Sequence, residues 1–278
     1  SRWWCVIGLV CGPDGTLPTN RPTPEDHELT NDLEAAVVQH GADLGVGLHG
    51  DGDRCGLIDG HGHHVAADRR LALLARDLLD RMPGASVVFD VKSSQVLPDI
   101  IREHGGHPVM WKAGHSLMKK KMAEIGAPIG GEVSGHLFIG EDYYGFDDAP
   151  LVALKVLELY SKTTKSLSQL LGEMPKLLAT PEIIMSAPDD VKFRIIDAVR
   201  DRLQDQYEVI TVDGARAIFE HGWGLVRASN TQPAITMRFE AHTREQLVTY
   251  MRRFNDLLDD YPQVDRDPLL KQIDAFGS

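Results

Sequence analysis

The segment His-Gly-Asp-Gly-Asp-Arg at 49–54 lies between two apolar stretches and concentrates groups that could hold a metal. Its alternating glycines permit a tight turn, so the side chains of His49, Asp51 and Asp53 can converge. Carboxylate oxygens are suitable ligands for Mg²⁺. An EF-hand calcium loop counted from Asp51 is excluded, because its twelfth position requires glutamate and is Gly62 here. The alternative is a solvated hairpin, which would explain one Asp-Gly pair but not this density.

A second glycine-rich segment, Gly-Gly-Glu-Val-Ser-Gly-His at 130–136, presents a carboxylate, a hydroxyl and an imidazole within one turn. The groups belong to Glu132, Ser134 and His136, and they suit hydrogen bonding to neighbouring hydroxyls of a sugar. A polar connecting loop is the alternative interpretation of the same residues.

A third segment, Arg-Ala-Ser-Asn-Thr-Gln-Pro at 227–233, lies between two predicted strands. A guanidinium, two hydroxyls, an amide and the N–H groups of a turn together make a cradle for a dianionic phosphate. The residues concerned are Arg227, Ser229, Asn230 and Thr231. A hairpin turn whose serine and asparagine cap the backbone is the alternative.

In order and in spacing, the three segments resemble three loops of the α-D-phosphohexomutases, in particular the phosphomannomutase/phosphoglucomutase branch. Segment 49–54 is similar to the family's DGDGDR metal loop, 130–136 to its GEMSGH sugar loop, and 227–233 to its RASNTTP phosphate loop. The resemblance implies Mg²⁺ bound by positions 49, 51 and 53. Because His49 replaces an aspartate, and imidazole prefers softer ions, we expect the metal to be held more weakly.

The resemblance also implies roles for the other candidates. Glu132 and Ser134 would bind the 3- and 4-hydroxyls of a hexose, with His136 supporting the site. The loop at 227–231 would hold a phosphate group of the substrate. The implied candidates for proton transfer and phosphate contact are Lys92, which follows an apolar strand, His115, in a segment similar to the family's KTGHS, and Arg54.

In that family a phosphoserine passes its phosphoryl group to a hexose 1- or 6-phosphate, and a bisphosphorylated sugar forms. This sequence has no serine followed by His-Asn, as in the family's TASHNP segment. We therefore expect the back portion of a longer mutase that acts on mannose or glucose phosphates, is monomeric when complete, and has negligible turnover as this chain alone. The alternatives are a non-catalytic sugar-phosphate-binding fragment and a phosphoglucosamine mutase, although Val133 departs from the GEQSGH loop common in the glucosamine branch.

Hydrophobic patterning predicts the elements that position these loops. The early part reads as a strand at 3–10, a loop at 11–25, a helix capped at Thr30 or Asn31, and strands at 42–47 and 55–58. The next part reads as helix 69–81, strand 86–90, helix 95–104, strand 108–111, helix 118–125, a glycine-rich turn at 126–131, and helix 149–162. This alternation predicts a largely parallel sheet covered by helices.

The pattern changes near residue 177. Strand 182–186 and helix 189–204 come first, then strands at 208–212, 215–218, 224–227 and 234–240, and then helix 243–258. The predicted fold class is α/β, with two mixed-sheet domains of the phosphohexomutase type, the first only partial, followed by an α+β domain with an antiparallel sheet. The expected boundaries are 1–65, 66–176 and 177–278.

Composition excludes several classes of protein. With 41 acidic and 29 basic residues, the net charge of −12 argues against nucleic-acid binding, although it does not exclude a small anionic substrate. No apolar run approaches the roughly 20 residues that span a bilayer. The three cysteines fit no zinc spacing, and their odd number argues against a secreted disulfide framework. We expect reduced, mostly buried thiols in a cytoplasmic protein.

Two other polar clusters have ordinary explanations. The histidines at 61–64 are predicted to form an exposed hairpin turn after the metal-type loop, although they could suggest a zinc site. The basic run at 119–121 is predicted to be a solvated helix face.

Overall fold

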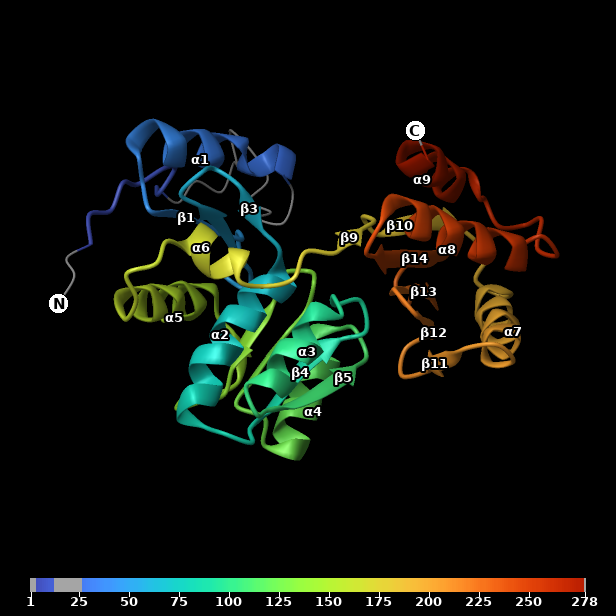
Figure 1. Cartoon of the computed structure of the whole chain (residues 1–278), viewed down its shortest axis with the longest axis horizontal. Coiled ribbons are helices and arrows are strands. Elements are labelled where there is room, and N and C mark those ends of the chain that lie inside the picture. The colour runs from blue at the N-terminus through green and yellow to red at the C-terminus, as the bar shows by residue number, and fades with distance from the viewer. Residues whose placement is uncertain (1–3, 13–26, 278) are drawn as a thin grey trace. The chain divides into compact units, whose positions relative to one another are not determined.

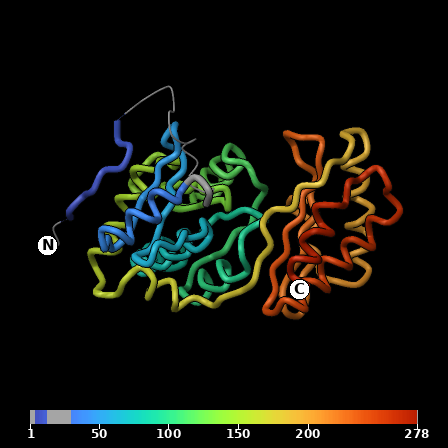
Figure 2. The backbone as a smooth tube through the Cα atoms, turned by 90° about the horizontal axis from the view of Figure 1, so that it is seen from above, coloured from blue at the N-terminus to red at the C-terminus, as the bar shows by residue number. Residues whose placement is uncertain are grey.

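A computed structural model describes residues 4–12 and 27–277 of the chain, which divides into two compact units, 1–175 and 176–278 (Figure 1). The tube in Figure 2 follows the backbone from the first unit into the second. Most of the loop predicted at 11–25 lies outside the described residues.

The first unit begins with a helix and a small antiparallel sheet. The elements are α1 (His27–His40), β1 (Leu44–Leu48), β2 (Cys55–Asp59) and β3 (His64–Val65). Leu48 pairs with Cys55, so residues 49–54 form the tip of the β1–β2 hairpin. A second hairpin joins β2 to β3 and confirms the predicted turn at the histidine cluster. The parallel arrangement expected here is wrong, because strands joined by such short turns must run antiparallel.

Two predictions near the start of the chain are also wrong. Residues 4–10 form no strand, and Val6 is 86% exposed. A strand needs a neighbour for its backbone hydrogen bonds, and among the described residues this segment pairs with none. Helix α1 begins at His27, so Thr30 and Asn31 lie inside it, and the Thr30 hydroxyl donates to Glu34 at 2.9 Å.

A five-stranded mixed sheet forms the larger part of the first unit, in the order β5-β4-β6-β7-β8. Its strands are β4 (Ser86–Asp90), β5 (His107–Trp111), β6 (Ile129–Gly131), β7 (Leu137–Ile139) and β8 (Phe146–Asp147). Strand β4 runs parallel to β5 and β6, whereas β6–β7 and β7–β8 are antiparallel. The segments that follow β4, β5 and β6 therefore meet at one edge of the sheet, where ligand sites of α/β folds form.

Five helices accompany this sheet: α2 (Ala67–Arg81), α3 (Val96–Glu103), α4 (His115–Ile125), α5 (Ala149–Ser161) and α6 (Leu167–Gly172). Helix α2 buries an apolar face that includes Leu71, Leu74 and Leu78. Strands β6, β7 and β8 and helix α6 were not predicted, because elements this short carry little periodicity. The predicted turn at 126–131 is wrong over residues 129–131, which form β6. Helix α4 begins at His115, earlier than the predicted 118, and this places His115 in its first turn.

The second unit is the predicted α+β domain. Its antiparallel sheet has the order β10-β14-β13-β12-β11, with β9 also paired to β14. The strands are β9 (Leu178–Ala179), β10 (Ile183–Ser186), β11 (Glu208–Ile210), β12 (Ala215–Phe219), β13 (Gly222–Ala228) and β14 (Ala234–Ala241), and the helices are α7 (Lys192–Gln204), α8 (Arg244–Leu257) and α9 (Asp267–Gly277). A core that includes Met185, Val199 and Phe254 joins sheet and helices. Pairing of Ala228 with Ile235 sets the loop between β13 and β14.

The described residues include no membrane-spanning helix, and the three cysteines differ in burial. Over the described ranges, no helix is long and apolar enough to cross a bilayer. Cys55 is buried, but Cys5 and Cys11 are exposed, so the expectation of mostly buried thiols is wrong. Both exposed cysteines belong to the segment 4–12, in which every described residue is exposed and no packed core is available to cover them.

Candidate functional site

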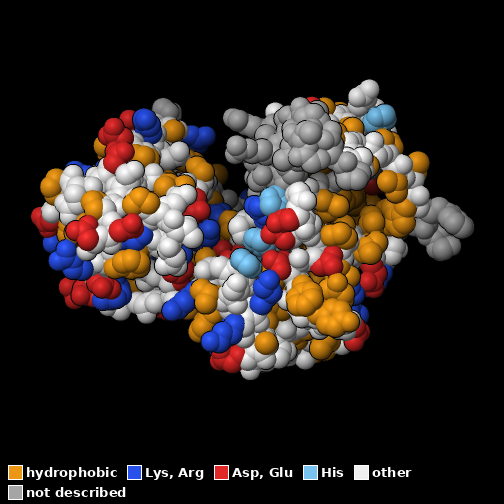
Figure 3. All heavy atoms as spheres, turned by 180° about the vertical axis from the view of Figure 1, so that it is seen from behind, with side chains coloured by type: hydrophobic (Ala, Val, Ile, Leu, Met, Phe, Trp, Pro, Cys, Tyr) orange, Lys and Arg blue, Asp and Glu red, His pale blue; other side chains and the backbone are white. Residues whose placement is uncertain are grey.

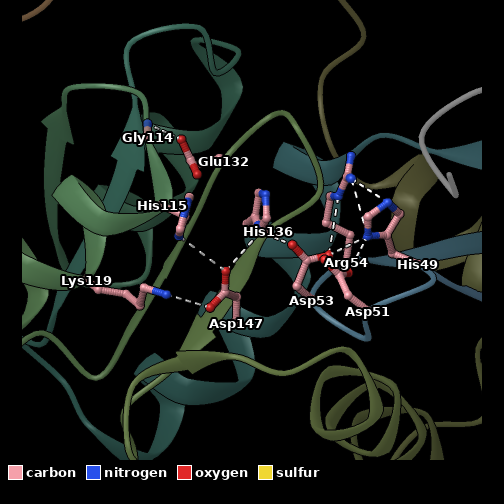
Figure 4. Close-up of polar contacts among 10 residues, drawn as sticks. All are labelled: His49, Asp51, Asp53, Arg54, Gly114, His115, Lys119, Glu132, His136 and Asp147. Carbon is pink, nitrogen blue, oxygen red and sulfur yellow. Dashed lines mark hydrogen bonds and ion pairs between the residues drawn. The ribbon is translucent and has the colours of Figure 1, made fainter. Parts of the chain in front are cut away.

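The tip of the β1–β2 hairpin brings together the three predicted metal ligands (Figure 4). Nδ1 of His49 lies 2.5 Å from Asp51 Oδ1 and 2.7 Å from Asp53 Oδ1. A φ of +78° at Gly52 allows the turn, and its N–H donates to the His49 carbonyl at 2.9 Å. The potential ligand atoms of the three side chains lie within 4.8 Å of one another.

The chemistry of this donor set fits a divalent cation. Contact with the Asp53 carboxyl group, followed by hydrogen bonding to His49, lowers the pKa of Asp51 to about 2, so this side chain is anionic at neutral pH. One imidazole nitrogen and two carboxylates can together bind such an ion. The guanidinium of Arg54 lies 2.6 Å from His49 Nε2, and its positive charge opposes a cation at that position. The weaker metal binding expected from His49 stays a prediction.

The metal-type loop lies against the 132–136 loop. Arg54 and His136 form an isolated antiparallel bridge. The Gly52 carbonyl accepts from the backbone N–H of Ala149 at 2.9 Å. Nδ1 of His136 lies 3.5 Å from Asp53 Oδ2. Two segments that are far apart in sequence therefore form one polar surface within the first unit.

Asp147, at the end of β8, is at the centre of that surface. Its carboxylate lies 2.8 Å from Lys119 Nζ, 3.0 Å from His136 Nδ1 and 3.9 Å from His115 Nδ1. Burial acts to raise the pKa of Asp147, but hydrogen bonding and charge from Lys119, together with His136, lower it below the usual value. The imidazole rings of His115 and His136 stack with centroids 5.6 Å apart. His136 is thus held by a carboxylate on one side and by a ring on the other.

Neither Asp147 nor Lys119 was singled out from the sequence. Asp147 precedes the predicted helix at 149–162, where an aspartate reads as a cap, and Asp148 does cap that helix. The prediction of a solvated face is wrong for Lys119, because its ammonium is paired with Asp147. Only the pairing of β7 with β8 places Asp147 beside the histidine, and those strands were not predicted.

Glu132 follows β6 and is 5% exposed. Its Oε1 accepts from the backbone N–H of Gly114 at 2.5 Å. Burial raises the pKa of Glu132 to about 7, and the nearby charge of Asp90 adds to this rise. The hydrogen bond from Gly114 and the charge of Lys92 oppose the rise. Lys92, half-buried in the turn after β4, is therefore electrostatically coupled to the Glu132 carboxyl group.

The remaining candidates of the first unit are also found on this surface. Ser134 is half-buried in the same loop as Glu132. The side chain of His115 is 55% exposed, and that of Asp51 is 66% exposed. In the space-filling view, histidine and acidic side chains lie side by side on one face of the first unit (Figure 3). The surface is thus open to a solute while its innermost carboxyl groups stay buried.

Three of the four candidates of the second unit, Ser229, Asn230 and Thr231, lie in the loop between β13 and β14, and Arg227 lies near the end of β13. Ser229 N–H donates to the Ala234 carbonyl at 2.9 Å and closes the loop. The Ser229 hydroxyl accepts from the backbone N–H groups of Thr231 at 3.4 Å and Gln232 at 3.2 Å. The capping expected of a hairpin turn is therefore present, while Asn230 and Thr231 are exposed at the tip.

Two contacts behind this loop were not expected from the sequence. Arg227 is 8% exposed, and its Nε and Nη2 lie 3.1 Å and 3.0 Å from Asp213 Oδ2. Lys192, in the first turn of α7, donates to the Ser229 carbonyl at 2.6 Å and to the Gln232 carbonyl at 2.8 Å. The Asp-Gly at 213–214 reads as an ordinary turn, and a single lysine near a helix start gives no signal.

Comparison with known proteins finds one family along most of the chain. Residues 5–62 match the model described as "Phosphoglucomutase/phosphomannomutase, alpha/beta/alpha domain II", 66–178 match its alpha/beta/alpha domain III, and 183–257 match its C-terminal domain. These matches agree with the predicted fold class and with the resemblance of the three loops.

Individual relatives point the same way. A phosphomannomutase/phosphoglucomutase of Pseudomonas putida is 46% identical over 243 residues, which cover 87% of this chain and 52% of the relative. A phosphoglucomutase of Neisseria meningitidis is 38% identical over 262 residues, covering 93% and 57%. The crystal structure of a phosphoglucomutase/phosphomannomutase family protein from Burkholderia thailandensis superposes with a TM-score of 0.86 at 37% identity, over 91% of this chain and 54% of the other. The chain spans about half the length of the curated relatives it matches.

Proposed function

Because the chain belongs to the phosphoglucomutase/phosphomannomutase family, we propose that it is part of a phosphohexomutase, an intramolecular phosphotransferase. The proposed enzyme interconverts the 1- and 6-phosphates of mannose or glucose through a phosphoserine and a bisphosphorylated sugar. The observation that carries the proposal is the contact of the metal-type loop with the 132–136 loop through Asp53 and His136. The domain boundaries 1–65, 66–176 and 177–278 belong to the same proposal, whereas the cytoplasmic location and the monomeric state stay predictions.

Mg²⁺ is the metal that we propose for positions 49, 51 and 53. When bound, it would offset negative charge on a phosphoryl group during transfer. In this chain His49, Asp51 and Asp53 would supply the ligand atoms, and Arg54 adds a positive charge beside them. The guanidinium can also bind a phosphate oxygen directly, which is why we assign Arg54 to the phosphoryl-transfer step.

Sugar binding is assigned to Glu132 and Ser134. A carboxyl group whose pKa is about 7 is close to half-protonated at neutral pH, so Glu132 can accept a hydrogen bond from one hydroxyl and donate to another. His136 supports this loop, since Asp147 holds its Nδ1 at 3.0 Å and fixes the orientation of the ring. The loop therefore presents ordered polar groups before any ligand arrives.

We assign proton transfer and phosphate contact to Lys92 and His115. Lys92 lies where the parallel strand β4 ends, and its charge acts on Glu132. His115 is exposed in the first turn of α4 and stacks on His136, so its imidazole can reach a bound solute. Both side chains have acid–base chemistry suited to moving a proton to or from a hydroxyl group that is being phosphorylated.

Phosphate binding in the second unit is assigned to Arg227, Ser229, Asn230 and Thr231. The exposed tip offers the Asn230 amide and the Thr231 hydroxyl. Arg227 supplies buried positive charge, although its Nε and Nη2 are already engaged by Asp213. We propose that this loop binds one phosphate of a hexose phosphate.

Calorimetry of the chain with mannose 1-phosphate, and with mannose as the control ligand, tests the binding part of the proposal. We expect heat of binding with the phosphorylated sugar and none with mannose. In Glu132→Ala, which loses a charged hydrogen-bonding group, the affinity should be at least tenfold lower. Equal behaviour of the two ligands, or no binding, would contradict it. Asp80→Ala, at an exposed position on α2, serves as the matched control.

A coupled mutase assay on the mass-verified chain tests the catalytic part. Because no serine here is followed by His-Asn, a non-catalytic sugar-phosphate-binding state is the second candidate for this chain by itself. We expect binding without measurable turnover. Ordinary turnover would mean that another residue of this chain donates the phosphoryl group.

A further inference from the structure

Lys192 is a buried lysine whose ammonium group makes three short contacts. Its side chain is 5% exposed, and Nζ lies 2.6 Å from Asp189 Oδ1. The same Nζ donates to the carbonyls of Ser229 at 2.6 Å and Gln232 at 2.8 Å. Since an ammonium group has three N–H donors, these three acceptors can use all of them.

The two carbonyls belong to opposite ends of the exposed tip of the β13–β14 loop. The loop is already closed by the Ser229–Ala234 backbone bond and by the Ser229 hydroxyl. A hairpin of this kind does not require a buried charge, and burying an ammonium group is costly unless it is paired. Here the ammonium group is paired, and its contacts tie both ends of the tip to one buried side chain.

The electrostatic effect favours an anion at the tip. Carbonyl oxygens that faced a phosphate would repel it, whereas here the carbonyls of Ser229 and Gln232 face Lys192. Asp189 balances the lysine charge, but its side chain is 70% exposed, so water screens it more than the buried ammonium group. The buried ammonium group of Lys192 therefore lies against the two carbonyls that flank Asn230 and Thr231, where its charge favours an anion.

We propose that Lys192 is a positioning residue for phosphate binding by the 229–232 loop. It orients the carbonyls of Ser229 and Gln232 away from the ligand and places a buried positive charge behind the exposed tip. This inference rests on the phosphate-binding role proposed above for the same loop. Lys192 is not assigned any contact with the substrate.

Titration of the full, ¹⁵N-labelled chain with glucose 6-phosphate tests the inference, with glucose as the control ligand. The amide signals of Asn230 and Thr231 report binding. Lys192→Met is expected to weaken binding about tenfold and to speed amide hydrogen exchange at Thr231 and Gln232, because the loop loses its charged anchor. Asp189→Asn keeps the lysine and is expected to leave the affinity within about twofold, or to tighten it.

The outcomes separate the two proposals. If the unaltered chain binds glucose 6-phosphate and a folded Lys192→Met variant binds equally well, the positioning role is wrong and the loop assignment stands. If the unaltered chain shows no phosphate-dependent shifts at Asn230 and Thr231, both the assignment of this loop to phosphate binding and the present inference are wrong. If Lys192→Met does not fold, Lys192→Arg is measured instead. This variant keeps the charge but changes its geometry, so we expect binding to weaken about threefold. An unchanged affinity would overturn the inference.

Discussion

The 49–54 and 132–136 loops of the first unit are joined by contacts between charged side chains, whereas the 229–232 loop of the second unit is held through its own backbone groups, which the side chains of Ser229 and Lys192 bind. Asp147 alone contacts Lys119 and His136, and Asp53 is shared by His49 and His136. In the second unit, Ser229 and Lys192 bind the backbone of the loop, and the residues of its tip stay exposed.

The difference implies that stability and binding depend on the same residues in the first unit and on different residues in the second. In the first unit a substitution at one charged residue leaves its partners without compensation, so we expect folding, ionisation and the proposed metal binding to change together. In the second unit the exposed side chains of the tip can change without disturbing the loop, because what holds the loop lies behind it.

Asp147→Ala is expected to have the largest effect on stability. It would leave Lys119 and His136 without their carboxylate. Breaking a buried ion pair on one side costs about 3–5 kcal/mol, and we expect the lower end of this range because the Lys119 side chain is 31% exposed. Urea unfolding, followed at the transition of the first unit, measures the change in the free energy of unfolding. Asp80→Ala on exposed α2 is the control, and a loss for Asp147→Ala no larger than the control's would contradict a central role for Asp147.

Glu132→Gln is expected to alter the pH dependence of stability. The folded protein raises the pKa of Glu132 from 4.5 to about 7, so it binds the proton more tightly than the unfolded chain does. The resulting stability is complete below about pH 4.5 and is lost as the pH rises through about 7. The variant should match the wild type at pH 4.5 and exceed it by up to about 3 kcal/mol at pH 8. A difference that does not vary with pH would refute this assignment.

His49→Asp is expected to tighten Mg²⁺ binding about tenfold, since it adds a negative oxygen ligand to Asp51 and Asp53. Calorimetric titration with MgCl₂ measures the affinity. His61→Asp adds the same charge on the exposed turn after β2 and should leave the affinity unchanged. Equal affinities of His49→Asp and the wild type would show that position 49 is not a ligand.

Asn230→Ala is expected to change stability least. Asn230 is exposed at the tip, so the free energy of unfolding should shift by less than about 0.5 kcal/mol. Its affinity for glucose 6-phosphate should fall about fivefold through loss of a hydrogen bond. Gln206→Ala, in the exposed turn after α7, should change neither quantity. A large stability loss for Asn230→Ala would remove the contrast between the two regions.

Much of the fold could be predicted from the sequence where hydrophobic patterning is long or regular. Strand 86–90 was predicted with the bounds of β4, and helix 149–162 ends one residue beyond α5. The prediction of a strand at 3–10 is wrong over the described residues 4–10, because apolar composition alone does not provide a neighbouring strand to pair with. The short strands β7 and β8 were missed because so few residues carry no detectable period.

The candidate site was predictable where residues cluster in one loop. Converging side chains at 49–53 follow from glycine spacing, and their contacts agree with that prediction. Asp147, Asp213 and Lys192 could not be found this way, because each acts on residues distant in sequence. Only strand pairing or the packing of α7 brings them to their partners.

The central claim is that the 132–136 and 229–231 loops bind hexose phosphate. Its most direct test is backbone amide NMR of the ¹⁵N-labelled chain during titration with glucose 1,6-bisphosphate. We predict saturable shifts at Glu132, Ser134 and Gly135 in the first unit and at Ser229, Asn230 and Thr231 in the second. Shifts confined to residues outside both loops, or an unchanged spectrum, would contradict the claim.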